Sequence, residues 1–219
     1  MLRVGLTGSL GSGKSTAAQL FAARGAHLLN ADEIGRGLMQ PGQPVYAAIV
    51  ARFSPGILLP DKKLDRPAIA RIVFADPAAL SDLNAIVHPA TIVRQTELLA
   101  GIAAADPHGV AIIESALIFE TAHNGPDGWR SRFDRIILVT APEADRIARF
   151  IERTHPNPNP AERSALQAEA CRRLAQQLPE EKKAELADYI LTNNGNLAHL
   201  EAQVDRLWPD LQRTARTNV

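Results

Sequence analysis

The N-terminal part of the chain alternates between short apolar runs and one amphipathic stretch. Val4–Thr7 is apolar and stops at a glycine, a pattern typical of a buried parallel strand. Lys14–Arg24 carries its apolar positions on one helical face and is followed by Gly25, a helix stop, and Ala26–Leu29 is a second apolar run. Strand, loop, helix and strand in this order predict a βαβ unit, the usual opening of a parallel α/β fold.

Residues 35–105 have a different pattern. After a turn predicted at 37–44, apolar positions recur at helical spacing, and no segment alternates as a strand would. We predict helices at 45–53, 66–74 and 76–104, and we expect Pro89 to break or kink the last of them. This stretch is interpreted as a helical insertion in an α/β core.

The α/β pattern resumes after residue 109. Val110–Ile113 and Arg135–Val139 are short, apolar and rich in β-branched residues, as central strands are, and Tyr189–Leu191 is a last short strand. Residues 121–128 and the proline-rich 154–160 are predicted to be loops, the second an extended hinge. The helices predicted for this part lie at 142–153, at 161–177, from Pro179 onward and at 196–208.

The first predicted strand leads into a phosphate-binding motif. Gly8–Ser15 fits the pattern G-x-x-x-x-G-K-[S/T]. Backbone N–H groups converge on a phosphate only where glycines let the loop wrap closely. Lys14 can then reach the β- and γ-phosphates, the helix N-terminus adds a partial positive charge, and Ser15 can ligate Mg²⁺. The alternative is a glycine-rich βα turn without a ligand, which the strand before it and the helix after it disfavour.

This motif indicates a nucleotide-phosphate site and does not by itself separate a kinase from a GTPase or a transport ATPase. A GTPase would carry an N-K-x-D guanine motif, and Thr192–Gly195 does not fit that pattern. A small P-loop kinase is therefore the leading class.

Asp32 is the first candidate on the acceptor side. It follows the second predicted strand, and the carboxyl ends of strands line the ligand crevice of an open α/β sheet. A carboxylate beside the γ-phosphate position can orient and deprotonate an attacking hydroxyl. The alternative is that Asp32 only caps the next helix, in which Glu33 and Ile34 follow in suitable order.

Nine sequence blocks together resemble the dephospho-coenzyme A kinase family. In chain order they are Gly5–Thr16, Ala31–Ile34, Pro41–Gly42, Leu64–Arg66, Val73–Phe74, Leu83–Pro89, Leu117–Glu120, Arg173–Pro179 and Ala187–Gly195. The phosphate loop is generic, but the LDR, LN-x-x-x-HP and L-x-FE blocks are not. The blocks span nearly the whole chain.

The resemblance implies an ATP-dependent kinase with Mg²⁺ that phosphorylates the ribose 3′-hydroxyl of dephospho-CoA, the last step of coenzyme A synthesis. It implies an α/β P-loop fold of three layers with a five-stranded parallel sheet, whose core is 1–34, 106–145 and 186–219. Residues 35–105 would be a helical CoA-binding region, and 146–185 a short lid. The family's general base falls on Asp32.

The candidate site residues combine the motif chemistry with this resemblance. Lys14, Asp32 and Arg149 are the catalytic candidates, and Arg66 and His88 join Asp32 as acceptor-binding candidates. The candidates for Mg²⁺ are Ser15 and Glu114, and those for ATP are Gly11, Ser12, Gly13, Lys14, Ser15, Thr16, Arg153 and Asn193.

Some of these candidates have a structural alternative. Arg66 can form an ion pair with Asp65 or another acid, and His88, which precedes a proline, can fix a bend between two helices. Arg149 and Arg153 lie one helical turn apart. They can steady the ATP phosphates when a lid closes, or form an ordinary solvated basic face.

Three positions depart from the family's pattern. Asn30 stands where the family has an aspartate, Glu114 replaces an aspartate expected near Mg²⁺, and Ala116 replaces a proline. Two alternatives stay open: the helical stretch 35–105 would serve a different acceptor equally well, although the LDR and HP blocks argue against that, and the three departures keep open a protein without catalytic activity. One is another small-molecule or nucleoside kinase on the same scaffold, and the other is a non-catalytic ATP-binding regulator.

Composition narrows the partners. The 219 residues include 24 Lys or Arg and 24 Asp or Glu, so the zero formal charge gives no bulk electrostatic case for binding nucleic acid or a membrane surface. No apolar run reaches the ~18 residues of a membrane span, and Cys171 is the single cysteine. We therefore expect a cytoplasmic monomer or weak homo-oligomer whose partners are ATP and dephospho-CoA.

Overall fold

The structure, a computed structural model, describes residues 1–120 and 128–217, so the loop predicted at 121–128 lies almost entirely outside the described residues. The chain divides into two compact units. The first unit combines Met1–Leu29 with Ile102–Val219, and the second is Asn30–Gly101. In the part of the chain that is described, no helix has both the length and the apolar character needed to cross a membrane.

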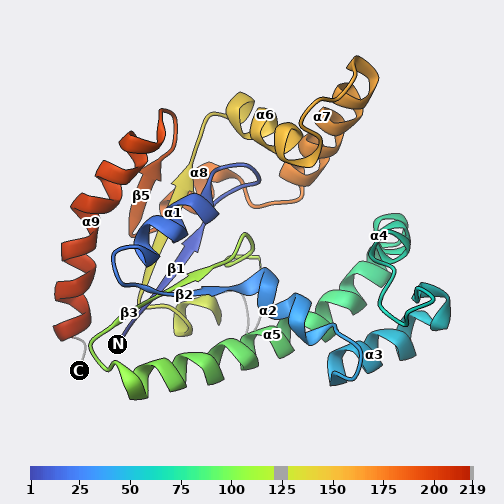
Figure 1. The fold of residues 1–219 in the computed structure, drawn as a ribbon, viewed down its shortest axis with the longest axis horizontal. Coiled ribbons are helices and arrows are strands. Elements are labelled where there is room, and N and C mark those ends of the chain that lie inside the picture. Colours follow the sequence, from blue (N-terminus) through green and yellow to red (C-terminus); the bar gives the residue numbers. More distant parts are fainter. Residues whose placement is uncertain (121–127, 218–219) are drawn as a thin grey trace. The chain divides into compact units, whose positions relative to one another are not determined.

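A single sheet of five parallel strands forms the centre of the first unit, in the order β2-β3-β1-β4-β5 (Figure 1). In the central strand, Leu6 lies beside Glu114 of β3 on one side and beside Ile137 of β4 on the other. The five-stranded parallel sheet predicted from the sequence is confirmed. The strands are β1 Leu2–Thr7, β2 His27–Asn30, β3 Val110–Glu114, β4 Arg135–Thr140 and β5 Tyr189–Thr192.

Two helices, α1 (Lys14–Ala22) and α9 (Leu197–Thr217), pack against this sheet. Phe21 of α1 is fully buried, and the ring centroid of Trp208 lies 6.2 Å from that of Phe21, so the partly buried Trp208 packs against the core. The prediction that the last helix ends at Trp208 is wrong, because α9 continues through Pro209 to Thr217. Leu211 and Ala215 beyond the proline are fully buried, and this burial outweighs the ~3 kcal/mol that proline costs inside a helix.

The second unit is helical, as predicted. Its helices are α2 Ala31–Leu38, α3 Pro44–Phe53, η1 Pro55–Ile57, α4 Arg66–Ala75 and the first part of α5, Pro77–Ala105. Residues Ile49, Phe53, Ile57, Ile69 and Val73 are buried in a core of their own, separate from the core around the sheet. The insertion contains no strand, and its single β-bridge joins Leu58 to Leu64.

Helix α5 corrects one expectation. The helix runs unbroken past Pro89, so of the predicted break or kink the break does not occur, and the kink stays a prediction. The proline removes one backbone hydrogen bond, but Ala79 before it and Ile92 after it are both buried, so packing holds the two halves in one helix. His88 consequently lies inside one continuous helix and not between two separate helices.

The first unit also contains α6 (Glu143–Thr154), α7 (Pro160–Ala175), α8 (Glu180–Leu186) and the short η2 (Gly128–Ser131). Helices α6 and α7 pack on each other through a small apolar cluster that includes Phe150 and Ala170 (Figure 1). Helix α7 begins with a capping box, in which Asn159 and Glu162 satisfy each other's backbone N–H groups. It ends at Ala175, two residues earlier than predicted, and the chain then runs through 176–179 to α8.

Candidate active site

The phosphate loop joins β1 to α1, and close contacts fix its glycines. Gly11 and Gly13 have φ angles of +73° and +93°, in the left-handed region that favours glycine. A side chain at Gly11 would collide with the carbonyl of Arg146, and one at Gly13 would collide with the Asn193 amide. The loop therefore needs glycine at both positions, for its conformation and for its packing.

Lys14, Ser15 and Thr16 form the first turn of α1, which starts at the end of the loop. The ammonium group of Lys14 donates to the carbonyl oxygens of Gly8 (2.8 Å) and Ser9 (3.1 Å). These bonds hold the Lys14 side chain against the loop, with its positive charge next to the carbonyl oxygens of Gly8 and Ser9. The arrangement fits a cation that neutralises bound phosphates.

The two metal candidates lie together. The Ser15 hydroxyl donates to Oε1 of Glu114 at 2.6 Å, and Glu114 is a nearly buried residue at the end of β3. A hydroxyl and a carboxylate are oxygen ligands of the kind that Mg²⁺ prefers, and Mg²⁺ usually takes its remaining ligands from water and nucleotide phosphates. Among the described residues there is no cluster of three or more His, Cys, Asp or Glu side chains that could hold a metal alone. The residues present thus fit Mg²⁺ bound together with a nucleotide.

Arg149 and Asn193 connect α6 and the end of β5 to the phosphate loop. The Arg149 guanidinium donates to the Asn193 carbonyl at 3.0 Å, and the Asn193 amide donates to the carbonyl of Ser12 at 2.9 Å. Nη1 of Arg149 and the hydroxyl of Ser12 are buried without a hydrogen-bond partner among residues 1–120 and 128–217. The structure therefore brings these three sequence candidates together beside the loop.

The predicted pair of lid arginines is not equivalent in the structure. Arg149 is half-buried against the loop, whereas Arg153, one turn later in α6, is exposed and makes no ion pair within the described ranges. Sequence reasoning missed Arg146 on the same helix. Its guanidinium is nine-tenths buried and lies 3.0 Å from Oε2 of Glu180. Its spacing of three residues from Arg149 was the available signal, because residues three apart share a helix face.

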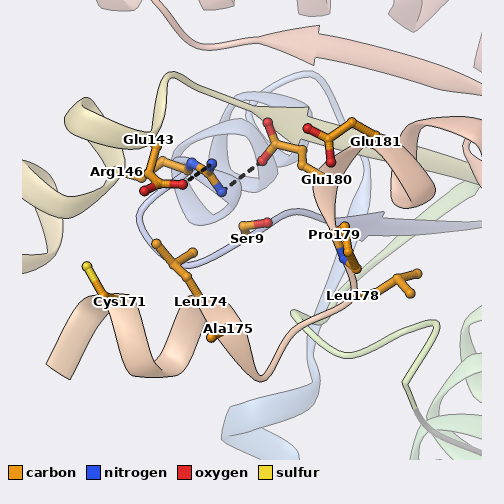
Figure 2. A pocket seen from close by; sticks show the side chains of 10 residues that line it. All are labelled: Ser9, Glu143, Arg146, Cys171, Leu174, Ala175, Leu178, Pro179, Glu180 and Glu181. Atoms are coloured by element: carbon orange, nitrogen blue, oxygen red, sulfur yellow. Dashed lines mark ion pairs between the residues drawn. The ribbon is translucent and has the colours of Figure 1, made fainter. Parts of the chain in front are cut away.

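Arg146 also lines a cleft beside the loop (Figure 2). The cleft has a volume of about 360 Å³ and lies between Ser9, the start of α6, the end of α7 and the start of α8. Glu180 faces it and accepts a hydrogen bond from Thr140 at the end of β4. The Arg146–Glu180 pair thus connects the helices that follow β4 to the sheet.

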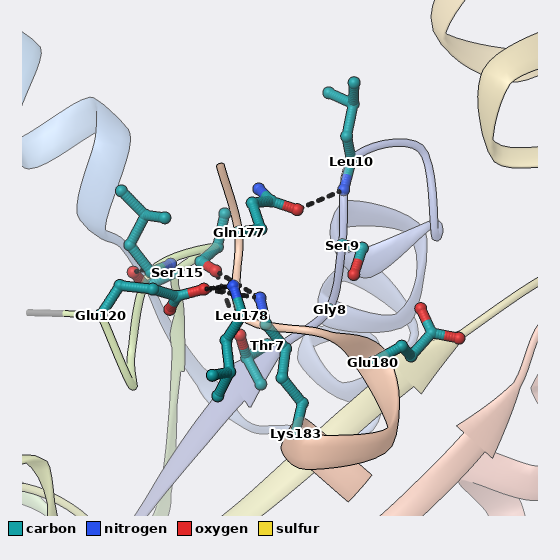
Figure 3. A network of polar contacts seen from close by, with 12 residues as sticks. Thr7, Gly8, Ser9, Leu10, Ser115, Glu120, Gln177, Leu178, Glu180 and Lys183 are labelled. Atoms are coloured by element: carbon teal, nitrogen blue, oxygen red, sulfur yellow. Dashed lines mark hydrogen bonds and ion pairs between the residues drawn. The ribbon is translucent and has the colours of Figure 1, made fainter. Parts of the chain in front are cut away.

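A second network of polar contacts also reaches the loop (Figure 3). Lys183 is fully buried and its ammonium lies 2.9 Å from Oε1 of Glu120. The same oxygen accepts the backbone N–H of Leu178 at 3.0 Å, and the neighbouring Gln177 accepts the backbone N–H of Leu10 at 3.2 Å. The sequence placed Glu120 and Gln177 in family blocks but gave no sign that Lys183 is buried.

The acceptor candidates stand on three helices of the second unit. Asp32 is exposed in the first turn of α2, and the cap of that helix is Asn30, whose side chain accepts the backbone N–H of Glu33 at 3.0 Å. The interpretation of Asp32 as a helix cap is therefore wrong, and its carboxylate is available for another role. His88 is half-buried on α5.

Arg66 is the first residue of α4 and is exposed. Its neighbour Asp65 caps that helix by accepting the backbone N–H of Ala68 at 3.0 Å. Within the described residues Arg66 forms no ion pair, so the alternative of a structural ion pair with Asp65 is wrong. A cationic side chain exposed at a helix start is suited to binding a phosphate.

Comparisons with known proteins agree with these observations. A family model described as dephospho-CoA kinase matches residues 2–199. The dephospho-CoA kinases of Leifsonia xyli subsp. xyli and Streptomyces avermitilis are 36% and 38% identical, covering 97% and 98% of this chain and 100% and 96% of theirs. Among solved structures, TT1252 from Thermus thermophilus has a TM-score of 0.74 at 30% identity, with 96% of this chain and 97% of that chain covered.

Proposed function

Because the chain belongs to the dephospho-CoA kinase family and is an ATP-dependent kinase of dephospho-CoA, we propose that it phosphorylates the ribose 3′-hydroxyl of that substrate. The products are coenzyme A and ADP. The observation that carries the proposal is the family match over residues 2–199, joined to a phosphate loop in which hydrogen bonds hold Lys14 and Ser15 and with which Arg149 is connected through Asn193. The alternatives of another acceptor or a regulator without catalytic activity are not favoured.

In the proposed reaction the chain positions the substrates and neutralises charge. The loop N–H groups and Lys14 hold the ATP phosphates, and Arg149 and Arg153 stabilise the charge of the phosphoryl group in transfer. Asp32 accepts the proton of the 3′-hydroxyl as its oxygen bonds to the γ-phosphorus, and the bond to the ADP oxygen breaks.

Arg66 and His88 are proposed to bind the acceptor in the helical unit. Each has a side chain that can meet a phosphate or a hydroxyl, Arg66 as a fixed cation and His88 as a donor or acceptor. The exposure of Arg66 at the start of α4 supports this role, and His88 is proposed for it from the family resemblance.

Ser15 and Glu114 are the residues that would hold Mg²⁺. When bound there, the ion supplies positive charge to the phosphates of ATP. Glu114 carries one methylene more than the aspartate of the family's pattern, and its contact with Ser15 shows that it reaches the loop.

The wider organisation remains a proposal. We assign 1–34, 106–145 and 186–219 to the nucleotide-binding core, 35–105 to acceptor binding and 146–185 to a lid. A cytoplasmic location, a monomeric or weakly oligomeric state and the absence of a nucleic-acid partner stay predictions from composition.

The test is a mass-spectrometric assay with the purified chain, MgATP and dephospho-CoA. A gain of one phosphoryl group is expected, and fragmentation should place it on the ribose. Adenosine and pantetheine phosphate serve as parallel acceptors and should gain none. Phosphate elsewhere on dephospho-CoA, or transfer only to a parallel acceptor, would contradict the proposed hydroxyl. ATP binding without any transfer would point to the regulator.

A further inference from the structure

The segment that returns from α7 to α8 touches the phosphate loop through a side chain. Oε1 of Gln177 accepts the backbone N–H of Leu10, which is a loop residue, at 3.2 Å (Figure 3). Backbone N–H groups are the part of such a loop that binds phosphate, so their orientation decides how well the loop fits its ligand. Gln177 holds one of these groups in place from outside the loop.

Leu10 is held from the same region a second time. Its side chain packs on the apolar cluster between α6 and α7, which includes Phe150 and Ala170. Leu10 therefore has two restraints, one polar and one apolar. Both come from the part of the chain that runs from α6 to the start of α8. The position of this part of the loop depends on how these residues are anchored.

The anchor is a buried ion pair. The backbone N–H of Leu178, the residue after Gln177, donates to Oε1 of Glu120, and the ammonium of Lys183 lies 2.9 Å from the same oxygen. Lys183 is fully buried and also donates to the carbonyl of Ala116 at 3.4 Å. A buried ammonium is stable only when it is paired and hydrogen-bonded, so these contacts fix α8 and Leu178 to the segment after β3.

We propose that Gln177 is a positioning residue for ATP, which acts by orienting the phosphate loop at Leu10, and that the Glu120–Lys183 pair acts through Gln177 by fixing the segment that carries it. The pair does not touch the nucleotide. The proposal rests on the proposed function for its kinetic consequences, but nucleotide binding tests it without any acceptor.

The first experiment compares two adjacent glutamines. Gln177→Met keeps the size of the side chain and removes the acceptor, so the loss of one hydrogen bond should weaken binding of a fluorescent ADP analogue with Mg²⁺ about fivefold. The KM for ATP should rise by the same factor, while kcat and the KM for dephospho-CoA change less than twofold. Gln176→Met is the matched control, since Gln176 is exposed and its side chain makes no hydrogen bond among the described residues. It should leave all these values within twofold.

The second experiment tests the anchor without leaving a buried charge alone. Glu120→Gln with Lys183→Met removes both charges and keeps an oxygen for the Leu178 N–H, so ADP affinity should stay within twofold of the wild-type value. Glu120→Leu with Lys183→Met removes that oxygen as well and should weaken ADP binding about fivefold. Adding Gln177→Met to this second double variant should cost less than twofold more, because all these changes act on one restraint.

Two results would overturn the proposal. One is unchanged ADP affinity in the folded Gln177→Met protein, and the other is equal ADP affinity in the two double variants. If the wild-type chain binds ADP but makes no coenzyme A, the proposed function fails while the ADP measurements still decide the role of Gln177.

Discussion

The phosphate loop and the helical unit hold their candidate residues in different ways. Around the loop, Lys14, Ser15 and Arg149 each have a hydrogen-bonding partner that fixes the side chain before any ligand binds. In the helical unit, Asp32 and Arg66 are exposed on the first turns of their helices. Preorganised donors stabilise a developing charge best, because they need no rearrangement at the moment of reaction. Exposed side chains instead lose rotamer freedom only when the acceptor binds.

The difference predicts how substitutions in the two regions should show themselves. Changes at the loop should reduce turnover, because they remove charge from the reacting phosphates. Changes among the exposed acceptor-binding residues should raise the KM for dephospho-CoA and leave ATP binding alone. Asp32 is the exception in the helical unit, since its proposed role is in the chemical step.

The largest effect is expected at Lys14. Lys14→Met removes the cation that faces the loop carbonyls and should lower kcat about 10³-fold, within the range for loss of one preorganised transition-state contact. The measurement is ADP release in a coupled assay. Lys182→Met is the control, because Lys182 is exposed and pairs only with Glu185 within the described residues. A decrease in kcat of less than tenfold would remove Lys14 from the catalytic group.

Asp32→Asn should follow, with kcat lowered at least ~100-fold and little change in ATP affinity. The amide keeps the size of the side chain and cannot accept the hydroxyl proton. Glu33→Gln changes the neighbouring exposed carboxylate in the same way and should leave kcat within about twofold. Turnover that is unchanged in Asp32→Asn would rule out Asp32 as the base.

The sequence predicted the first region better than the second, for a physical reason. The loop is continuous in the chain, and its glycines, Lys14 and Ser15 are required by a single local geometry. The helix cap at Asn30 was not predicted, because the choice between Asn30 and Asp32 depends on which residue keeps an extended backbone. Asn30 does, with φ −105° and ψ 115°.

Burial and charge pairing were the least predictable features. Pro89 and Pro209 both stand inside helices, because apolar residues on each side of them are buried against other elements. Lys183 looks like a surface residue in a charged helix, and its burial depends on Glu120, which is distant in the sequence. Local sequence patterns carry no information about such partners.

A smaller effect is expected at Arg66, which belongs to the helical unit. Arg66→Met should raise the KM for dephospho-CoA about tenfold, as expected for the loss of one charge-assisted contact, and leave the KM for ATP unchanged. Arg71→Met provides a matched control on the same helix, since Arg71 is also exposed. Equal effects of the two substitutions would show that Arg66 contributes only to the general positive charge of α4.

The smallest effect concerns the sheet that supports the loop. The Arg3 backbone N–H and guanidinium donate to the two carboxylate oxygens of Asp134, both at 2.7 Å, and so tie β1 to the start of β4. Burial acts to raise the pKa of Asp134, but the hydrogen bonds from Arg3 outweigh it, so the pKa lies below the usual aspartate value. The unfolded state therefore binds a proton more readily than the folded state does. The stabilisation is complete above the ordinary pKa of about 4 and is lost as the pH falls through the lowered folded-state value.

Asp134→Asn should accordingly reduce the free energy of unfolding by about 1 kcal/mol at pH 7, a value discounted for the partial exposure of Arg3. In urea unfolding measured from pH 7 to pH 3, the difference from the wild type should shrink below about pH 4. The matched pair in the helical unit is Arg52–Asp82, whose side chains are 46% and 45% exposed, and Asp82→Asn should cost less than about 0.5 kcal/mol at pH 7. A larger loss of unfolding free energy from Asp82→Asn than from Asp134→Asn would show that this ion pair does not stabilise the sheet more than Arg52–Asp82 stabilises the helical unit. The difference between the two units would then be limited to the hydrogen bonds around the phosphate loop.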